Sequence, residues 1–383
     1  MPPNDSEPPR RFAIESELRE GEQLLVLRDR AGSASATIWP AFGCNCLGAR
    51  LPAPDGQVRD VLLSPPSLDD LRRQPSWWGI PLLFPWPGRI PQGMYEFAGR
   101  IYRLPALDAG GAAIHGFVKD RPWRVERAEA SETAAEVTAT CSSDDHPETL
   151  EGFPFPYRLS VTFRLTVSEL ELDFEVSNPG AAVLPFGLGA HPYLLLPLGP
   201  QGRRETCLVQ VPAARRWRLD TLRQLTPPAA PSEPLSWEEV TEPVSGAVDL
   251  RVPQALGDRL YDDVFTSLAA AGGESECLVA GPDVGLASVV RASAAFPTLV
   301  VYTPPGRPAI CFEPWTAPPN VFNLAARGLD RSGLMLLAPG AVWRGTMRLL
   351  LRSWPAPAGR HGPSTGAGPS GEPSPDQQEQ RRA

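Results

Sequence analysis

The segment from Tyr157 to Asn178, YRLSVTFRLTVSELELDFEVSN, alternates apolar and polar residues and is interrupted only near Ser168 and Glu169. A period of two places the apolar side chains on one face of an extended chain, which is typical of a half-buried β-strand. The interruption predicts a hairpin of two antiparallel strands. A fold that contains this hairpin must cover its apolar face with another layer of structure.

Strand-like patterns recur along the chain, whereas helical periodicity is almost absent. Further strand-like segments are LLVLRD, SATIWP, MYEFAG, RIYRLP, RPWRVERAEA, TAAEVTATCS, LVQVPAARRWRLD, ASVVRAS, TLVVYTP and WRGTMRLLLRS. Only SLDDLRR and TAPPNVFNLAARG could form short helical turns. The 46 prolines and 34 glycines supply turns between short strands. We therefore predict an all-β fold, a large antiparallel β-sandwich that occupies residues 11–354 as one domain.

The two ends of the chain have a different composition. Residues 1–10 are proline-rich and polar, and residues 355–383, PAPAGRHGPSTGAGPSGEPSPDQQEQRRA, are rich in proline and glycine. Such segments cannot bury enough apolar surface to offset the loss of chain entropy. We predict that both ends are disordered.

Charge and segment composition exclude several classes of protein. The net charge of −8 argues against binding to nucleic acid or to an anionic membrane surface. The N-terminal sequence lacks the apolar core of a signal peptide, and no segment approaches the roughly 18 apolar residues of a membrane span. The six cysteines are scattered without the spacing of a zinc site. We expect buried free thiols, no metal and a cytoplasmic protein.

The chain contains only four histidines. His361 lies in the C-terminal tail, and His146 lies in a polar segment where we expect a surface role. His115, in AIHGFVKDRPW, and His191, in FGLGAHPYLLLP, lie among apolar residues. Either one taken alone is more simply explained as a structural histidine.

Isolated charges in apolar segments change that interpretation. Arg89 stands in WWGIPLLFPWPGRIPQG, Asp262 and Asp263 stand in LYDDVF, and Glu313 stands in AICFEPWTAPPNVFNL. A buried charge is costly unless it is paired or faces a cavity. Several such groups in segments rich in tryptophan and proline predict one pocket with aromatic walls.

At these segments the sequence resembles the aldose 1-epimerases, or galactose mutarotases. GIPLLFPWPGRI, AIHGFVKDRPW, FGLGAHPYLLLP, DDVF and CFEPWTAPPNVFNL follow one another in that family's order and at its approximate spacing, from about residue 25 to 353. The resemblance implies a β-sandwich with a sugar-binding cleft. It also implies an enzyme without cofactor or metal that interconverts the α and β anomers of a free aldohexose.

The resemblance assigns the proton-transfer roles to two residues. Glu313 corresponds to the general base, which takes the proton of the anomeric hydroxyl, and His191 to the general acid, which protonates the ring oxygen. Burial lowers the pKa of a histidine, whereas a nearby carboxylate raises it. We therefore predict that Glu313 or Asp262 approaches His191 closely enough to keep it protonated.

The remaining candidates would bind the sugar. His115, Arg89 and one of Asp262 and Asp263 correspond to residues that hold the sugar hydroxyls and the ring oxygen. Trp315 is our candidate for an aromatic ring that stacks on the sugar. Many relatives have asparagine before the arginine where this chain has Gly88, so one polar contact of the family is in question here.

Other functions remain open at this stage. A hexose-6-phosphate 1-epimerase would need basic residues for the phosphate, and Arg72, Arg73 and Arg89 flank one of the relevant segments. A carbohydrate-binding protein could keep the fold without catalysis. A polysaccharide lyase or glycoside hydrolase has less support, because hydrolases ordinarily use paired carboxylates. The residues indicate no oligomeric state and no particular aldose.

Overall fold

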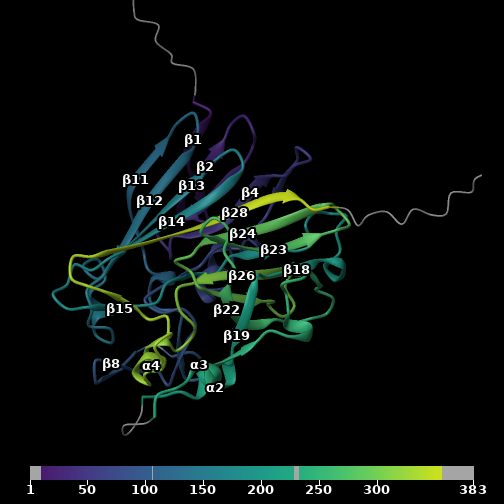
Figure 1. The fold of residues 1–383 in the computed structure, drawn as a ribbon. Coiled ribbons are helices and arrows are strands. Elements are labelled where there is room, and N and C mark those ends of the chain that lie inside the picture. Colours follow the sequence, from purple (N-terminus) through teal and green to yellow (C-terminus); the bar gives the residue numbers. More distant parts are fainter. Residues whose placement is uncertain (1–9, 106, 228–232, 356–383) are drawn as a thin grey trace, which may run out of the picture.

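The computed structural model describes residues 10–105, 107–227 and 233–355 (Figure 1). This part of the chain consists mainly of antiparallel strands, which confirms the predicted all-β class. Residues 1–9 and 356–383, and with them nearly all of the two ends predicted to be disordered, lie outside the described residues.

The largest sheet has nine strands (Figure 1). In spatial order they are β11 (Arg124–Ala130), β12 (Ala135–Ser142), β13 (Arg158–Leu165), β14 (Glu169–Ser177), β28 (Val342–Ser353), β24 (Leu286–Ser293), β23 (Glu274–Gly281), β18 (Leu208–Gln210) and β21 (Gln254–Ala255). The predicted hairpin at Tyr157–Asn178 is β13 and β14, and every second residue of β13 is buried.

The second sheet has eight strands and carries the site described below. Its strands are β20 (Thr241–Pro243), β19 (Ala213–Trp217), β22 (Asp262–Leu268), β25 (Thr298–Tyr302), β26 (Ala309–Trp315), β16 (Gly189–Ala190), β6 (Leu82–Leu83) and, also paired with β26, β17 (Tyr193–Leu195). β26 is a central strand, and all seven of its residues are buried.

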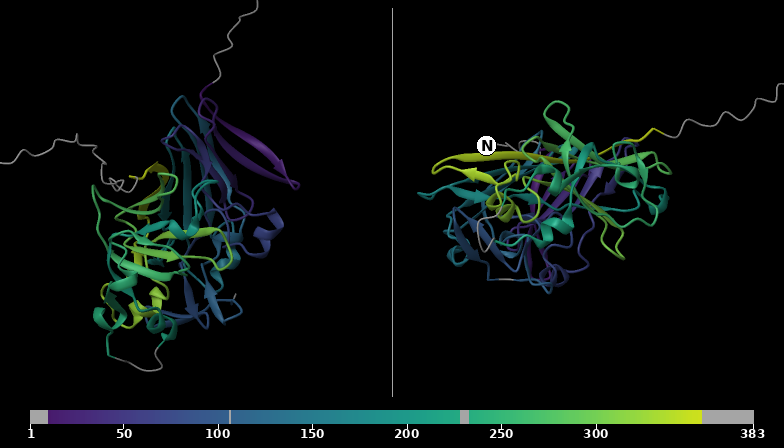
Figure 2. Two further views of the ribbon diagram at one scale, coloured as in Figure 1. Left: turned by 90° about the vertical axis from the view of Figure 1, so that its right-hand side faces the viewer. Right: turned by 60° about the horizontal axis from the view of Figure 1, so that its bottom comes forward.

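The N-terminal strands form a third sheet, which lies along one side of the molecule (Figure 2). It consists of β1 (Phe12–Arg19), β2 (Glu22–Asp29), β3 (Ser35–Trp39), β4 (Asn45–Pro52) and β5 (Val58–Asp60). Three two-stranded pairs complete the strands: β7 (Arg89–Pro91) with β10 (Ala112–Ile114), β8 (Met94–Phe97) with β9 (Arg100–Arg103), and β15 (Leu184–Phe186) with β27 (Met335–Leu337).

One continuous apolar core joins the three large sheets. It includes Ile38 of β3, Phe163 of β13 and Phe312 of β26, each fully buried. Because side chains alternate along a strand, β26 turns Ile310 and Phe312 to this core and its odd-numbered residues to the opposite face. That opposite face is where the polar groups gather.

The four helices are short: α1 (Leu68–Arg73), α2 (Leu219–Gln224), α3 (Trp237–Val240) and α4 (Val321–Ala326). α1 and α4 fall in the two segments predicted to form helical turns, and Ser67 caps α1 by accepting a hydrogen bond from the backbone N–H of Asp70. α2 and α3 were not predicted, because helices of six and four residues are too short to show a period. None of the described helices is long and apolar enough to cross a membrane.

Candidate active site

A cleft of about 710 Å³ opens on the face of the eight-stranded sheet that is turned away from the core. Six of the seven residues proposed from the sequence line it: Arg89, His115, His191, Asp262, Glu313 and Trp315. Asp263 is the exception. Of the isolated charges that we expected to surround one pocket, Arg89, Asp262 and Glu313 line this cleft.

The alternation of β26 places Glu313 in the cleft. Cys311, Glu313 and Trp315 are two residues apart and share one face of the strand, whereas Ile310 and Phe312 point into the core. Glu313 is 1 % exposed, so its carboxyl group lies in a dry environment. A one-residue change of register would turn it into the core, which the apolar neighbours prevent.

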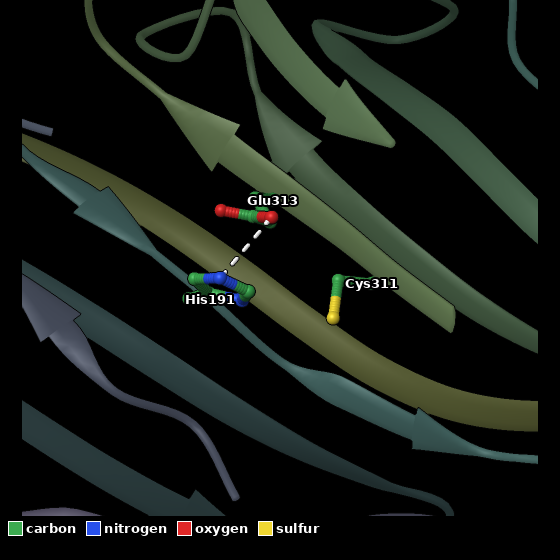
Figure 3. A group of neighbouring side chains, drawn as sticks. All are labelled: His191, Cys311 and Glu313. Carbon is green, nitrogen blue, oxygen red and sulfur yellow. Dashed lines mark ion pairs between the residues drawn. The ribbon is translucent and has the colours of Figure 1, made fainter. Parts of the chain in front are cut away.

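Strand register brings His191 to Glu313. Gly189 pairs with Trp315 and Tyr193 pairs with Cys311, so antiparallel pairing sets His191 opposite Glu313. Nε2 of His191 lies 3.4 Å from Oε1 of Glu313, and Figure 3 shows the two side chains pointing toward each other. Two residues that are far apart in the sequence thus form a buried acid–base pair.

Burial determines the charge of this pair. It lowers the pKa of His191 to about 3. Burial, with the nearby negative charge of Asp262 as a lesser cause, raises the pKa of Glu313 well above its usual range. Glu313 approaches His191 as predicted, but the pKa of His191 is lowered and not raised, because the cost of desolvation exceeds the attraction at this separation.

Polar atoms of the pair lack partners within the protein. Among the described residues, Nδ1 of His191, Oε2 of Glu313 and Nε1 of Trp315 are buried without a hydrogen-bond partner. Unpaired buried polar atoms are rare and costly. Three of them on one cleft wall indicate that the cleft is built to hold a polar ligand.

His115 lies next to His191, and a hydrogen bond determines which of its ring nitrogens carries the proton. The backbone N–H of Gly88 donates a hydrogen bond to Nδ1 of His115 at 3.1 Å. Nδ1 is therefore unprotonated, and burial lowers the pKa of His115 well below its usual range. The neutral ring carries its proton on Nε2, which is then a hydrogen-bond donor.

The backbone angle of Gly88 and the closeness of Pro319 favour glycine at this position. Gly88 has a φ of +71°, and a Cβ there would lie 2.9 Å from side-chain atoms of Pro319. An asparagine would meet both the left-handed backbone and this proline. The backbone N–H of Gly88 binds His115 at this position.

Asp262 and Asp263 lie on opposite faces of β22. Asp262 pairs with Tyr302 of β25 and lines the cleft, whereas Asp263 pairs with Val301, which belongs to the core face. The carboxylate of Asp263 accepts a hydrogen bond from Arg216 at 2.8 Å. Asp262 is thus the one of the two that can meet a ligand in the cleft, and the suggestion of Asp263 as a sugar-binding residue has no support from its position.

The arginines at the cleft are paired with aspartates. Arg89 donates to Asp108 at 3.0 Å, and Arg223 of α2 donates to Asp262 at 2.7 Å. Arg73 of α1 donates to Asp70 at 3.2 Å. Arg72, which we considered as a phosphate ligand, binds Glu22 and Asp69 and is not part of the cleft wall.

Trp315 lines the cleft with little of its ring exposed. Its side chain is 3 % exposed and meets the ring of His115 edge-on, with the ring centroids 6.0 Å apart. A Cβ at Gly189 would lie 2.4 Å from Cδ1 of Trp315, so glycine is needed there for the indole to take this position. The burial of Trp315 limits the broad stacking on a sugar that we suggested from the sequence.

The polar cleft residues that were not identified from the sequence include Lys119, Tyr193, Arg223, Tyr302 and Asp108. Tyr193 could have been found, because it lies two residues after His191 in the same strand-like segment and so shares its face. Lys119 is the single lysine of the chain, but nothing in its segment indicates a cleft. The prediction of a surface role for His146 was wrong, since that residue is buried and its Nε2 lies 2.9 Å from the carbonyl oxygen of Pro122.

The donor atoms of His191, Cys311 and Glu313 all lie within 4.8 Å of one another and could in principle hold a metal (Figure 3). Metals bind the thiolate form of cysteine. Burial and the neighbouring Glu313 raise the pKa of Cys311 well above its usual range, which opposes that form. All six cysteines are buried free thiols, as predicted.

Comparison with known proteins agrees with this geometry. A family model described as aldose 1-epimerase matches residues 24–350, so the chain belongs to the aldose 1-epimerase family. It is 27 % identical to the uncharacterised protein YihR of Escherichia coli over 267 residues, which cover 69 % of this chain and 76 % of that protein. It is 30 % identical to the aldose 1-epimerase of E. coli over 148 residues, which cover 38 % of this chain and 39 % of the relative.

Solved structures show the same fold. A galactose mutarotase-like protein from Clostridium acetobutylicum has a TM-score of 0.76 at 22 % identity, over 89 % of this chain and 99 % of the other. Galactose 1-epimerase from Lactobacillus acidophilus has a TM-score of 0.66 at 18 % identity, over 90 % of this chain and 100 % of the other. The fold is therefore the galactose mutarotase-like β-sandwich that the sequence predicted.

Proposed function

We propose that the protein is an aldose 1-epimerase that interconverts the anomers of a free aldohexose, with Glu313 and His191 as its acid–base pair. The observation that carries this proposal is the 3.4 Å contact between the two side chains within a polar-lined cleft. Membership of the aldose 1-epimerase family supports it.

The pair holds the protons that the reaction needs. Neutral His191 with protonated Glu313 and charged His191 with ionised Glu313 contain the same number of protons, so one transfer between them interconverts the two forms. Sugar hydroxyls that reach the buried pair favour the charged form, because they solvate both charges. The sugar thus meets a carboxylate and an imidazolium, although burial by itself favours the neutral groups.

Ring opening then proceeds by two proton transfers. Glu313 takes the proton of the anomeric hydroxyl, and His191 gives its Nε2 proton to the ring oxygen as the bond from C1 to that oxygen breaks. The products are a neutral carboxyl group, a neutral imidazole and an uncharged open-chain aldehyde. Burial, which penalises charge, therefore favours the opening step. Rotation about the C1–C2 bond and reversal of both transfers close the ring as the other anomer.

The remaining cleft residues would orient the sugar. Nε2–H of His115 is a fixed donor, Asp262 is an acceptor, and Arg89 is a donor held by Asp108. Such positioning supplies much of the rate in proton-transfer enzymes.

The arginine pairing favours a free sugar over a sugar phosphate. A phosphate dianion bound at Arg73, Arg89 or Arg223 would lie next to Asp70, Asp108 or Asp262, respectively, the carboxylates with which these arginines pair. Binding of a dianion next to these carboxylates is opposed by like-charge repulsion. We therefore place hexose 6-phosphates second.

The test is the rate at which anomers equilibrate, followed by polarimetry on freshly dissolved α-glucose and α-galactose and by NMR anomer exchange. We expect acceleration with a free aldose and little with glucose 6-phosphate. Faster turnover of the phosphate would support the 6-phosphate epimerase. Saturable sugar binding without acceleration of any sugar would identify a carbohydrate-binding protein and overturn the proposal.

A further inference from the structure

We infer that Lys119 binds the hydroxyl group on C6 of the sugar and so selects aldohexoses over aldopentoses. The inference rests on the proposed function, in which the anomeric hydroxyl lies at Glu313 and the ring oxygen lies at His191. It deepens that function by assigning the end of the cleft that receives C6 and the side chain that recognises its hydroxyl.

Lys119 lines the cleft and differs there from the arginines, because in the described part of the chain no carboxylate forms an ion pair with it. Arg73, Arg89 and Arg223 are each paired with an aspartate. Among the described residues, Nζ of Lys119 has one hydrogen-bond partner, the carbonyl oxygen of Gly116 at 2.8 Å. An ammonium group has three N–H donors, so two remain for a ligand.

The ammonium group of Lys119 is only partly solvated. Lys119 is half-buried in the cleft wall, and burial lowers its pKa from the ordinary value of 10.5. A partly desolvated charge gains from each oxygen that approaches it, and hydrogen bonds to charged groups are stronger than those between neutral groups. A sugar hydroxyl is an acceptor that suits this position.

The strand order shows on which side of the acid–base pair Lys119 lies. β26 carries Glu313, and β16 and β17, which flank His191, pair with β26 along one edge. β6 pairs with β16 on the side away from β26. On the far edge of β6, the carbonyl oxygen of the next residue, Phe84, accepts from the backbone N–H of Phe117 at 2.8 Å, two residues before Lys119. A path from Glu313 past His191 therefore leads to the segment that carries Lys119.

A pyranose bound as proposed points its C6 in this direction. The ring oxygen joins C1 to C5, so C5 and its substituent C6 lie beyond His191 as seen from Glu313. His115, four residues before Lys119, lies on this side, with its ring centroid 5.8 Å from that of His191. Asp262 lies on the opposite side of β26, on β22 with β25 between them, and so faces the end of the sugar that carries C1.

The contact distinguishes sugars by the presence of the C6 hydroxyl. A sugar that lacks this hydroxyl leaves the ammonium group of Lys119 without an acceptor in the closed-off cleft wall, which is costly. Aldopentoses lack C6 altogether. We therefore expect D-glucose to be preferred to D-xylose, which has the same ring hydroxyls, and to 6-deoxy-D-glucose.

The test combines one substitution with one missing hydroxyl. Lys119→Met removes the ammonium group and keeps an unbranched side chain, and 6-deoxyglucose keeps C6 as a methyl group. In the parent protein we expect kcat/KM for glucose to exceed that for 6-deoxyglucose roughly 10- to 100-fold, as for a hydrogen bond to a charged group. In Lys119→Met this ratio should fall to about 1, because glucose loses the contact and 6-deoxyglucose has none to lose.

The matched control is Arg121→Met, which removes a positive charge two residues further along the chain. Arg121 pairs with Glu148 at 3.2 Å and does not line the cleft. This variant should keep the ratio of the parent protein. Each ratio is measured within one protein, so a variant that is partly unfolded still gives a valid value.

Three results would overturn the inference. The first is an equal ratio of glucose to 6-deoxyglucose in the parent protein and in Lys119→Met. The second is a loss of preference in Lys119→Met toward 2-deoxyglucose and not toward 6-deoxyglucose, which would place the contact at another hydroxyl. The third is turnover of glucose 6-phosphate that is faster than that of glucose and is abolished in Lys119→Met, which would identify Lys119 as a phosphate ligand.

Binding measured by isothermal titration calorimetry separates this inference from the proposed function. A protein that accelerates no anomer exchange but binds glucose more tightly than 6-deoxyglucose, with the difference lost in Lys119→Met, contradicts the function and supports the contact of Lys119 with the C6 hydroxyl. An active enzyme in which Lys119→Met leaves the difference unchanged contradicts only the role of Lys119.

Discussion

Nε2 of His191 and Oε1 of Glu313 lie 3.4 Å apart, and both side chains are almost completely buried. His191 lies between Gly189 and Tyr193, which pair with Trp315 and Cys311 on either side of Glu313. At this separation the two groups act on each other through their charges, since the distance is longer than that of a usual hydrogen bond. The contact links the chemistry of the site to its stability, because each group has a pKa far from its value in water.

Replacement of Glu313 by glutamine should abolish most of the anomer exchange. The variant keeps the shape of the side chain and cannot accept the proton of the anomeric hydroxyl, so we expect a loss of about 10²- to 10⁴-fold in kcat. Sugar affinity should be largely kept, which isothermal titration calorimetry measures. An unimpaired Glu313→Gln enzyme would remove Glu313 from the mechanism.

The same variant should alter the dependence of stability on pH. The pKa of Glu313 is raised from its ordinary value of 4.5, so above that pH the unfolded chain releases a proton that the folded protein retains. Glu313 therefore costs stability as the pH rises, by about 1.4 kcal/mol per unit at most. Relative to the parent protein, Glu313→Gln should gain free energy of unfolding steadily from pH 5 to pH 8.

Urea unfolding at several values of pH measures this effect, and His191→Asn provides the opposite sign. The pKa of His191 is lowered from 6.5 to about 3, so between these values the unfolded chain binds a proton that the folded protein does not. The parent protein thus loses stability through His191 as the pH falls below 6.5. His191→Asn should gain stability relative to it in that window, and parallel curves for all three proteins would contradict the buried neutral pair.

The two neighbouring aspartates should differ in their effect on activity. Asp262→Asn removes a charged acceptor from the cleft, and we expect kcat/KM to fall roughly 10- to 100-fold, as for a hydrogen bond to a charged group. Asp263→Asn should leave kcat/KM unchanged, because Asp263 points away from the cleft and Arg216 still binds Glu242. Equal losses in the two variants would contradict the assignment by strand face.

Gly88 should tolerate no side chain. Gly88→Ala meets the left-handed φ of +71° and the atoms of Pro319, whereas Gly99→Ala meets a φ of +72° with nothing within 4 Å. Each costs about 1–2 kcal/mol for the backbone, and Gly88→Ala adds about 1–3 kcal/mol for the clash. Thermal unfolding should therefore show a larger drop in Tm for Gly88→Ala. Equal drops would show that Pro319 moves aside.

The sequence predicts the strands because apolar and polar residues alternate along them, and this alternation can be recognised in one sequence, as in β13 and β14. It also predicts the residues of the cleft, since Glu313 and His191 stand out as polar groups in apolar segments. It does not predict the charge of the pair, which depends on how far burial outweighs a contact of 3.4 Å. Nor does it predict which of Asp262 and Asp263 faces the cleft, because that depends on the register of β22 with β25.

Arg223 illustrates a second limit. It lies on α2, a helix too short to be recognised from the sequence. The connection between β19 and β22 contains this helix and brings Arg223 to Asp262. Such contacts depend on where connecting segments cross the sheet, and neither composition nor periodicity encodes that.

Gly189 and Tyr193 both pair with β26, one on each side of His191. The spacing of His191 and Glu313 is therefore set by backbone hydrogen bonds in the middle of a sheet, while Arg89, Lys119 and Arg223 reach the cleft from outside that sheet. Under the proposed function, changes in those outer segments would alter which sugar is accepted without moving the proposed acid and base. A scaffold of this kind allows a lineage to exchange substrates while it keeps one mechanism.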